Sequence, residues 1–169
     1  MDVLVVDGYN VIGDWEELNK LKQKDIGLAR VRLLDILSEY QGFTKNRVIV
    51  VFDALYVKGS ETRETENNVE IIYTKEDETA DECIEKLVQS LKNVKNQVYV
   101  ATSDYMEQRT IFSRGALRIS ARELLVEIKN MDKDIDEQLE INRKKRPKQK
   151  IEFHDHIRIQ FEKWRRGNN

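Results

Sequence analysis

Short apolar runs alternate with helical patterns along the first 130 residues, and this alternation restricts the possible folds more than any other feature. Runs rich in Val and Ile occupy residues 2–6, 47–52, 69–73 and 97–101, with a weaker run at 116–119. Such runs, bounded by turn or charged residues, are typical of strands buried on both faces of a sheet. Between them, apolar residues recur every three or four positions, as on one face of a helix. The sequence therefore predicts an α/β fold with helices on both sides of a central, mainly parallel sheet.

Two helix starts and one long loop can be predicted from local signals. Thr79 with Glu82, and Ser120 with Glu123, fit the capping box, in which two side chains satisfy backbone N–H groups of the first helical turn. Asp81 should therefore lie in the first turn of its helix. The polar segment 54–68 has no periodic pattern, and we predict a long loop there.

The carboxyl-terminal part of the chain is expected to form an extension of the main domain. We predict one domain over residues 1–130 and a basic helical extension over 131–169, with Pro147 separating a long helix from the last one. The extension should pack on the same domain through an apolar stripe of the last helix, formed by Phe153, Ile157, Phe161 and Trp164.

Charge is distributed unevenly although the formal net charge is only -2, from 29 basic and 31 acidic residues. Residues 143–169 carry +7 and the remainder -9. A basic tail on an acidic body is compatible with a polyanionic partner, and a solvated helical face is the alternative. The basic residues that we expect to contact RNA or a ribosome in this tail are Arg143, Lys144, Lys145, Arg146, Lys148, Lys150, Arg165 and Arg166.

Composition excludes several classes of protein. Cys83 is the one cysteine and lies on the apolar face of a predicted helix, so we expect a core residue, no disulfide partner and no cysteine-rich zinc site. His154 and His156 lack further zinc ligands and are expected at the surface. No apolar stretch is long enough for a membrane span, and the amino terminus does not resemble a signal peptide. These features predict a cytoplasmic protein without a membrane partner.

Acidic residues follow the predicted strands. Asp7 follows the first strand, Asp53 the second, and Asp104 the fourth after Ser103, while Asp81 enters from a helix start with Glu78 nearby. The carboxyl ends of parallel strands meet at one edge, where ligands bind.

Each aspartate alone could be a turn former or a helix cap, but together they would repel each other unless a cation is bound. Carboxylate oxygens suit Mg²⁺ or Mn²⁺. The predicted chemistry is metal-assisted phosphodiester hydrolysis, in which the ion activates water and offsets charge on the leaving oxygen.

Two neighbouring segments could support such a site. In the loop expected after the first strand, Gly8 allows a tight bend and Asn10 offers a neutral donor and acceptor near the ion. Lys58 and Arg63 lie near Asp53 in the predicted loop 54–68. They could contact RNA or a ribosomal surface, although a mobile connection fits that loop equally well. Trp15 either covers the site or packs beneath it.

Four motifs together resemble the NYN family of PIN-like nucleases. They are VVDGYNVI at residues 5–12, VVFDA at 50–54, ETADECIE at 78–85 and ATSDY at 101–105, in the order that the family uses. The resemblance implies a Rossmann-like PIN fold and magnesium-dependent endoribonuclease activity, with Asp7 and Asp81 catalytic and Asp53 and Asp104 in support. The basic tail is similar to that of the bacterial YacP-like branch, which implies cleavage of mRNA on translating ribosomes.

Other functions remain to be compared with this one. A PIN-like module that only binds RNA or a ribosome would use the carboxylates to organise the fold. A phosphatase of the haloacid dehalogenase type needs an aspartate two residues after the first, where this chain has Tyr9. A nucleotide-binding Rossmann protein needs a glycine-rich first turn, and residues 7–12 contain one glycine.

Overall fold

The computed structural model describes residues 1–54, 61–92, 95–103, 115–145 and 155–167. Within α7 (Asp155–Arg165) it describes only some of the side chains. The chain divides into two compact units, Met1–Asp132 and Lys133–Asn169.

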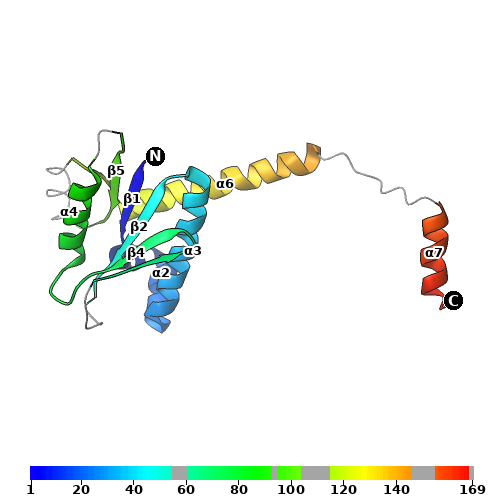
Figure 1. The fold of residues 1–169 in the computed structure, drawn as a ribbon, viewed down its shortest axis with the longest axis horizontal. Helices are drawn as coiled ribbons and strands as arrows, with labels where there is room; N and C mark the ends of the chain where they lie inside the picture. Colours follow the sequence, from blue (N-terminus) through cyan, green and yellow to red (C-terminus); the bar gives the residue numbers. More distant parts are fainter. Residues whose placement is uncertain (55–60, 93–94, 104–114, 146–154, 168–169) are drawn as a thin grey trace. The chain divides into compact units, whose positions relative to one another are not determined.

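The first unit is built on a six-stranded sheet with the order β3-β4-β2-β1-β5-β6 (Figure 1). All neighbouring strands are parallel except β3, which runs antiparallel to β4. The predicted mainly parallel α/β fold is therefore confirmed. The strands are β1 (Val3–Asp7), β2 (Arg47–Phe52), β3 (Thr62–Glu66), β4 (Val69–Tyr73), β5 (Val98–Ala101) and β6 (Leu117–Ile119).

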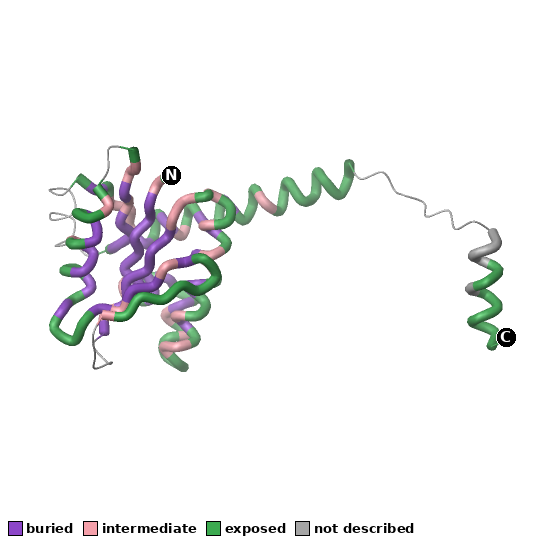
Figure 2. The backbone as a smooth tube through the Cα atoms, in the orientation of Figure 1, coloured by how far each residue is buried: buried purple, intermediate pink, exposed green. Residues whose placement is uncertain are grey.

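Burial on both faces explains why the central strands are apolar throughout. All five residues of β1 are buried, and Figure 2 shows the central strands in purple. Val5, Ile49 and Ile72 pack with helix α4 (Ala80–Leu91) in one core cluster. Because successive side chains of a strand point to opposite faces, Leu4, Val6 and Val50 belong to the other face, on the side of α2 (Glu16–Lys24) and α3 (Ile26–Thr44) in Figure 1.

The helix signals in the sequence are largely confirmed. Helix α3 buries Ala29, Leu33, Leu37 and Tyr40 at the predicted spacing. At the start of α6 (Ala121–Lys145), the Ser120 hydroxyl accepts the N–H of Glu123 at 3.0 Å, and the Glu123 carboxylate accepts the N–H of Ser120 at 3.0 Å. Thr79 caps α4 by accepting the N–H of Glu82 at 3.2 Å.

The loop predicted for segment 54–68 is wrong for residues 62–66, which form β3. All five residues of β3 are exposed, so the strand carries no apolar alternation and is held by backbone pairing with β4. Asn67 and Asn68 have φ of 49° and 68°, as in the tight turns that join hairpin strands. The two adjacent asparagines are the one signal in the sequence that could have revealed this hairpin.

The loop predicted after the first strand is also wrong, because helix α1 (Gly8–Asp14) begins directly after Asp7. Helix α2 follows it after Trp15 and was not predicted, since only Leu18 of its nine residues is buried. Glu16 and Glu17 in its first turn, with two lysines in its last turn, complement the helix dipole and could have indicated it.

The carboxyl-terminal unit contains the second half of α6 and the helix α7. The buried residues of α6 end at Met131. Trp164 of α7 has 79% of its surface exposed. Phe153 and the side chains of Ile157 and Phe161 lie outside the described residues, so the packing of this helix on the main domain stays a prediction. Among the described helices, none is both long and apolar enough to cross a membrane.

Candidate active site

Asp7 lies where the central strand β1 passes into α1. It is the last residue of β1 and the N-cap of α1, and its Oδ1 accepts the N–H of Asn10 at 3.4 Å. Only 8% of its surface is exposed. The fold thus fixes this carboxylate at the carboxyl edge of the sheet and at the positive end of a helix.

Gly8 makes this direct passage possible. A Cβ atom at position 8 would lie 2.3 Å from Cε1 of Phe52, whose ring is fully buried. Any other residue would therefore have to displace the Phe52 ring at the end of β2. The close neighbour that requires a glycine at position 8 is therefore the Phe52 ring.

Asp53 connects the end of β2 to the start of α4. Asp7 pairs with Val51 across the parallel strands, so Asp53, two residues later, lies on the same face of the sheet as Asp7. Its Oδ2 accepts the N–H of Ala80 at 3.4 Å. This bond places the first turn of α4, with the exposed Asp81, beside the edge that carries Asp7 and Asp53.

Asn10 positions the neighbouring strand end. Its Oδ1 accepts the backbone N–H of Ser103 at 2.8 Å, which ties α1 to the segment after β5. The amide oxygen of Asn10 is thus engaged with the backbone, and the side chain acts on the position of Ser103. Asp104 comes next in the chain and lies outside the described residues.

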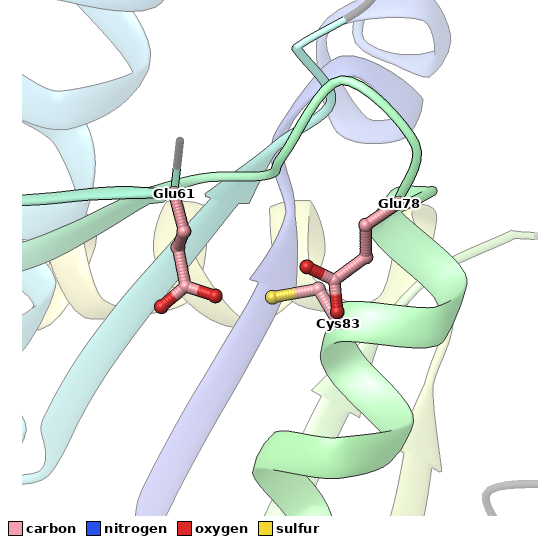
Figure 3. A group of neighbouring side chains, drawn as sticks. All are labelled: Glu61, Glu78 and Cys83. Atoms are coloured by element: carbon pink, nitrogen blue, oxygen red, sulfur yellow. The ribbon is translucent and has the colours of Figure 1, made fainter. Parts of the chain in front are cut away.

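Asp7, Asp53 and Asp81 share one edge of the sheet, but their carboxylate oxygens do not all lie within 4.8 Å of one another. Among the described residues, the one group of three His, Cys, Asp or Glu side chains with ligand atoms within 4.8 Å of one another is Glu61, Glu78 and Cys83 (Figure 3). Mg²⁺ usually keeps several waters and binds through one or two carboxylates. The aspartates therefore fit a magnesium ion held partly through water, and the set of purely oxygen donors suits that ion.

Glu78 belongs to this second group rather than to the aspartates. It is 7% exposed, and its Oε1 accepts a hydrogen bond from Lys86 Nζ at 2.8 Å. Cys83 is buried as expected, and burial raises the pKa of its thiol to about 11, so the thiol is protonated at neutral pH. The sequence did not predict that Glu61 lies beside Glu78 and Cys83, because its position depends on the unpredicted strand β3.

Aromatic side chains occupy the opposite face of the same strand ends. The ring centroids of Tyr9 and Phe52 are 5.0 Å apart, and those of Phe52 and Tyr73 are 5.6 Å apart. Arg30 Nη1 donates to the Tyr9 hydroxyl at 3.0 Å. No periodic signal in the sequence marks this cluster, since its members come from three separate elements.

Trp15 packs in the core at the junction of α1 and α2. Its side chain is buried, and its Nε1 donates to the carbonyl oxygen of Ala121 at 2.7 Å. This bond ties the junction of α1 and α2 to the start of α6.

The basic candidates occupy separate places in the fold. Arg63 lies on β3, is exposed, and pairs with Glu61 at 2.9 Å. Arg143, Lys144 and Lys145 end α6 and are exposed. Arg165 ends α7, and Arg166 lies 4.0 Å from Glu162. The candidates outside the described residues are Lys58, Arg146, Lys148 and Lys150. His154 and the side chain of His156, which were expected at the surface, also lie outside them.

Comparison with known proteins agrees with the motifs. Residues 4–166 match the YacP-like NYN domain. The chain is 51% identical over 168 residues to the uncharacterized protein YacP of Bacillus subtilis (strain 168), covering 99% of each chain.

Two solved structures are also similar. The crystal structure of Rae1 (YacP) from Bacillus subtilis has a TM-score of 0.74 at 51% identity, covering 99% of this chain and 97% of that chain. The W164L mutant of Rae1 has a TM-score of 0.77 at 49% identity, covering 86% of each chain. With a family match over nearly the whole chain and about half of the residues identical to a full-length relative, this protein belongs to the YacP-like NYN family of PIN-like nucleases.

Proposed function

We propose that this protein is a metal-dependent endoribonuclease that hydrolyses phosphodiester bonds in mRNA on translating ribosomes. The observation that carries the proposal is the placement of Asp7, a nearly buried carboxylate at the end of the central strand, beside Asp53 and the helix turn that carries Asp81. Membership of a PIN-like nuclease family supports it. The ribosome enters through the family resemblance.

The proposed roles follow from how each side chain is held. Asp7, Asp53 and Asp81, with Asp104, would hold Mg²⁺ or Mn²⁺, and Asp7 and Asp81 would be the catalytic carboxylates. When bound, such an ion lowers the pKa of an attacking water and offsets charge on the leaving oxygen. The helix cap fixes the Asp7 carboxylate before substrate arrives, and Asn10 holds Ser103 at the same edge. Such preorganisation is what positioning a phosphate for in-line attack requires.

The basic extension would bind the polyanion. Arg143, Lys144 and Lys145 are exposed at the end of a helix, where they can neutralise phosphates of mRNA or ribosomal RNA. Binding of this kind releases counterions, so its affinity should fall steeply with salt concentration.

One observation favours a second candidate, a non-catalytic module that binds RNA or a ribosome. Asp7 caps α1 and Asp53 accepts the N–H of the first residue of α4, and both roles are structural. An aspartate that only caps a helix can be replaced by asparagine with little loss, because asparagine caps equally well. Substitution by asparagine therefore separates the two candidates.

The test uses Asp7→Asn with Asp35→Asn as its matched control, since Asp35 is an exposed aspartate of α3. Each protein is incubated with mRNA and Mg²⁺, with and without translating ribosomes, and the RNA ends are mapped. We expect wild-type protein and Asp35→Asn to produce the same new ends, and Asp7→Asn to produce none. Equal cleavage by Asp7→Asn would exclude Asp7 from the chemistry, and absence of cleavage by the wild type would favour the binding module.

A further inference from the structure

Glu61, Glu78 and Cys83 form a second group of potential ligands beside the aspartates. They come from three places: the residue before β3, the turn before α4, and the first turns of α4 itself. One ligand atom from each lies within 4.8 Å of the other two. Figure 3 shows the Cys83 sulfur pointing toward the Glu61 carboxylate, with the Glu78 carboxylate beside it.

One oxygen of this group is buried without a partner. Glu78 is 7% exposed, and its Oε2 has no hydrogen-bond partner among the residues that the structure describes. A buried carboxylate oxygen without a hydrogen-bond partner loses its hydration with nothing in return. It is therefore unusual in a native fold and points to a bound species that would satisfy it.

Basic side chains orient both carboxylates from outside the group. Lys86 binds Oε1 of Glu78 at 2.8 Å, and Arg63 binds Oε1 of Glu61 at 2.9 Å. In both cases the ion pair uses Oε1, and for Glu78 this leaves the buried Oε2 without a hydrogen-bond partner among the described residues. Outer hydrogen bonds of this kind hold ligating carboxylates in place in metal sites.

We propose that Glu61, Glu78 and Cys83 bind a borderline-soft divalent cation such as Zn²⁺. Sulfur together with carboxylate oxygen suits Zn²⁺ and does not suit Mg²⁺, which takes oxygen ligands. Binding would displace the thiol proton of Cys83 into solvent, because the thiolate is the form that ligates a metal. Three protein ligands and one water would complete the usual tetrahedral coordination.

Such an ion would tie the edge strand β3 to α4, the helix that also carries Asp81. The proposal concerns a site separate from the aspartates and does not depend on nuclease activity.

The test is a titration of the full chain with Zn²⁺ against a chromophoric chelator, with absorption bands of bound Co²⁺ reporting the sulfur ligand. We expect one tight ion per chain that excess Mg²⁺ does not displace. Cys83→Ser and Glu61→Gln should each weaken binding by at least about tenfold, because loss of even an outer partner of a metal ligand costs that much. Cys83→Ser should also abolish the sulfur-dependent band.

Two control variants each remove one negative charge, as Glu61→Gln does, at positions outside the proposed zinc site. Glu64→Gln and Glu66→Gln each alter an exposed glutamate of β3, and both should bind Zn²⁺ as the wild type does. Glu61 is partly buried and lies directly before the edge strand β3. The Glu61→Gln variant should therefore keep its fold even where a change at buried Cys83 does not, and thermal melting without metal verifies this. Absence of tight binding in the wild type, or binding that Cys83→Ser and Glu61→Gln leave unchanged, would overturn the proposal.

Discussion

The acidic edge of the sheet and the basic extension differ in how firmly the fold holds their charged side chains. At the edge, Asp7 is 8% exposed and is fixed by a strand end, a helix cap and the ring of Phe52 beside Gly8. In the extension, Arg143, Lys144 and Lys145 stand on exposed helical positions. Chemistry at phosphorus depends on fixed geometry, whereas attraction to a polyanion depends mainly on the number of charges. If the proposed function is correct, cleavage depends on the acidic edge and association with RNA or ribosomes depends on the extension.

The largest effect should come from the edge. We expect Asp81→Asn to lower the cleavage rate by more than about 100-fold, because loss of an outer partner of a metal ligand alone costs 10- to 100-fold. Association with RNA or ribosomes should stay at the wild-type level, because the residues proposed to bind the polyanion are the basic residues of the extension, which Asp81→Asn leaves unchanged. Cleavage and cosedimentation assays on the same preparation measure both quantities. Cleavage at the wild-type rate would remove Asp81 from the catalytic group.

Packing behind Asp7 should produce the next largest effect. We expect Gly8→Ala to lower the free energy of unfolding by about 1–3 kcal/mol, the usual range for overpacking, because the added Cβ would lie 2.3 Å from the Phe52 ring. Gly13→Ala is the matched control in the same helix, with nothing within 4 Å of the added Cβ. It should raise stability by about 0.5–1 kcal/mol. Equal denaturant midpoints for the two variants would show that stability does not depend on the close contact between Gly8 and Phe52.

Neutralising the extension should weaken association. Changing Arg143, Lys144 and Lys145 together to Gln should lower affinity for RNA or ribosomes by roughly tenfold. The change should also make affinity depend less on salt. In a plot of log affinity against log salt concentration, the slope should become shallower by about 0.7 for each phosphate of single-stranded RNA that the variant no longer neutralises. The control makes the same change of charge at three exposed lysines of α2, namely Lys20, Lys22 and Lys24. Equal weakening in both proteins would mean that overall charge, rather than the extension, controls association.

The smallest effect is expected from an ion pair within the sheet that has no part in either function. Arg47 on β2 binds Glu70 on β4 through two hydrogen bonds, one of them 2.8 Å from Nη2 to Oε1, and this pairing lowers the pKa of Glu70. Both side chains are more than a third exposed, so we expect Glu70→Gln to cost less than about 1 kcal/mol at pH 7.

The pH dependence of this pair has a definite sign. Because the pKa of Glu70 is lowered in the folded state, the stabilisation is present above the ordinary pKa of glutamate, about 4.3, and is lost as the pH falls through the lowered value. The difference between wild type and Glu70→Gln in urea unfolding should therefore shrink below about pH 4. A pH-independent difference for Glu70→Gln would contradict the ion pair.

The parts of the fold that could be predicted are those in which one local pattern decides the structure. Continuous runs such as residues 47–52 become buried parallel strands, and the capping box at Ser120 marks the start of α6. The strand β3 could not be found from apolar spacing, because backbone pairing and the turn at Asn67 and Asn68 decide it.

The candidate site shows the same division. The positions of Asp7, Asp53 and Asp81 at strand ends and a helix start were predictable, because strand order and caps are encoded locally. The grouping of Glu61 with Cys83 was not, since it depends on where β3 lies relative to α4. Asp104 lies outside the described residues, and its role stays a prediction.

The most direct test of the account is the cleavage rate of ribosome-bound mRNA at saturating protein concentration. For the variant with Arg143, Lys144 and Lys145 changed to Gln, raising the concentration should restore the wild-type rate, because only association is weakened. For Asp7→Asn, the rate should stay more than about 100-fold below wild type at any concentration, since a ligand of the proposed metal is lost. Recovery of Asp7→Asn at high concentration would contradict the assignment of cleavage to the acidic edge.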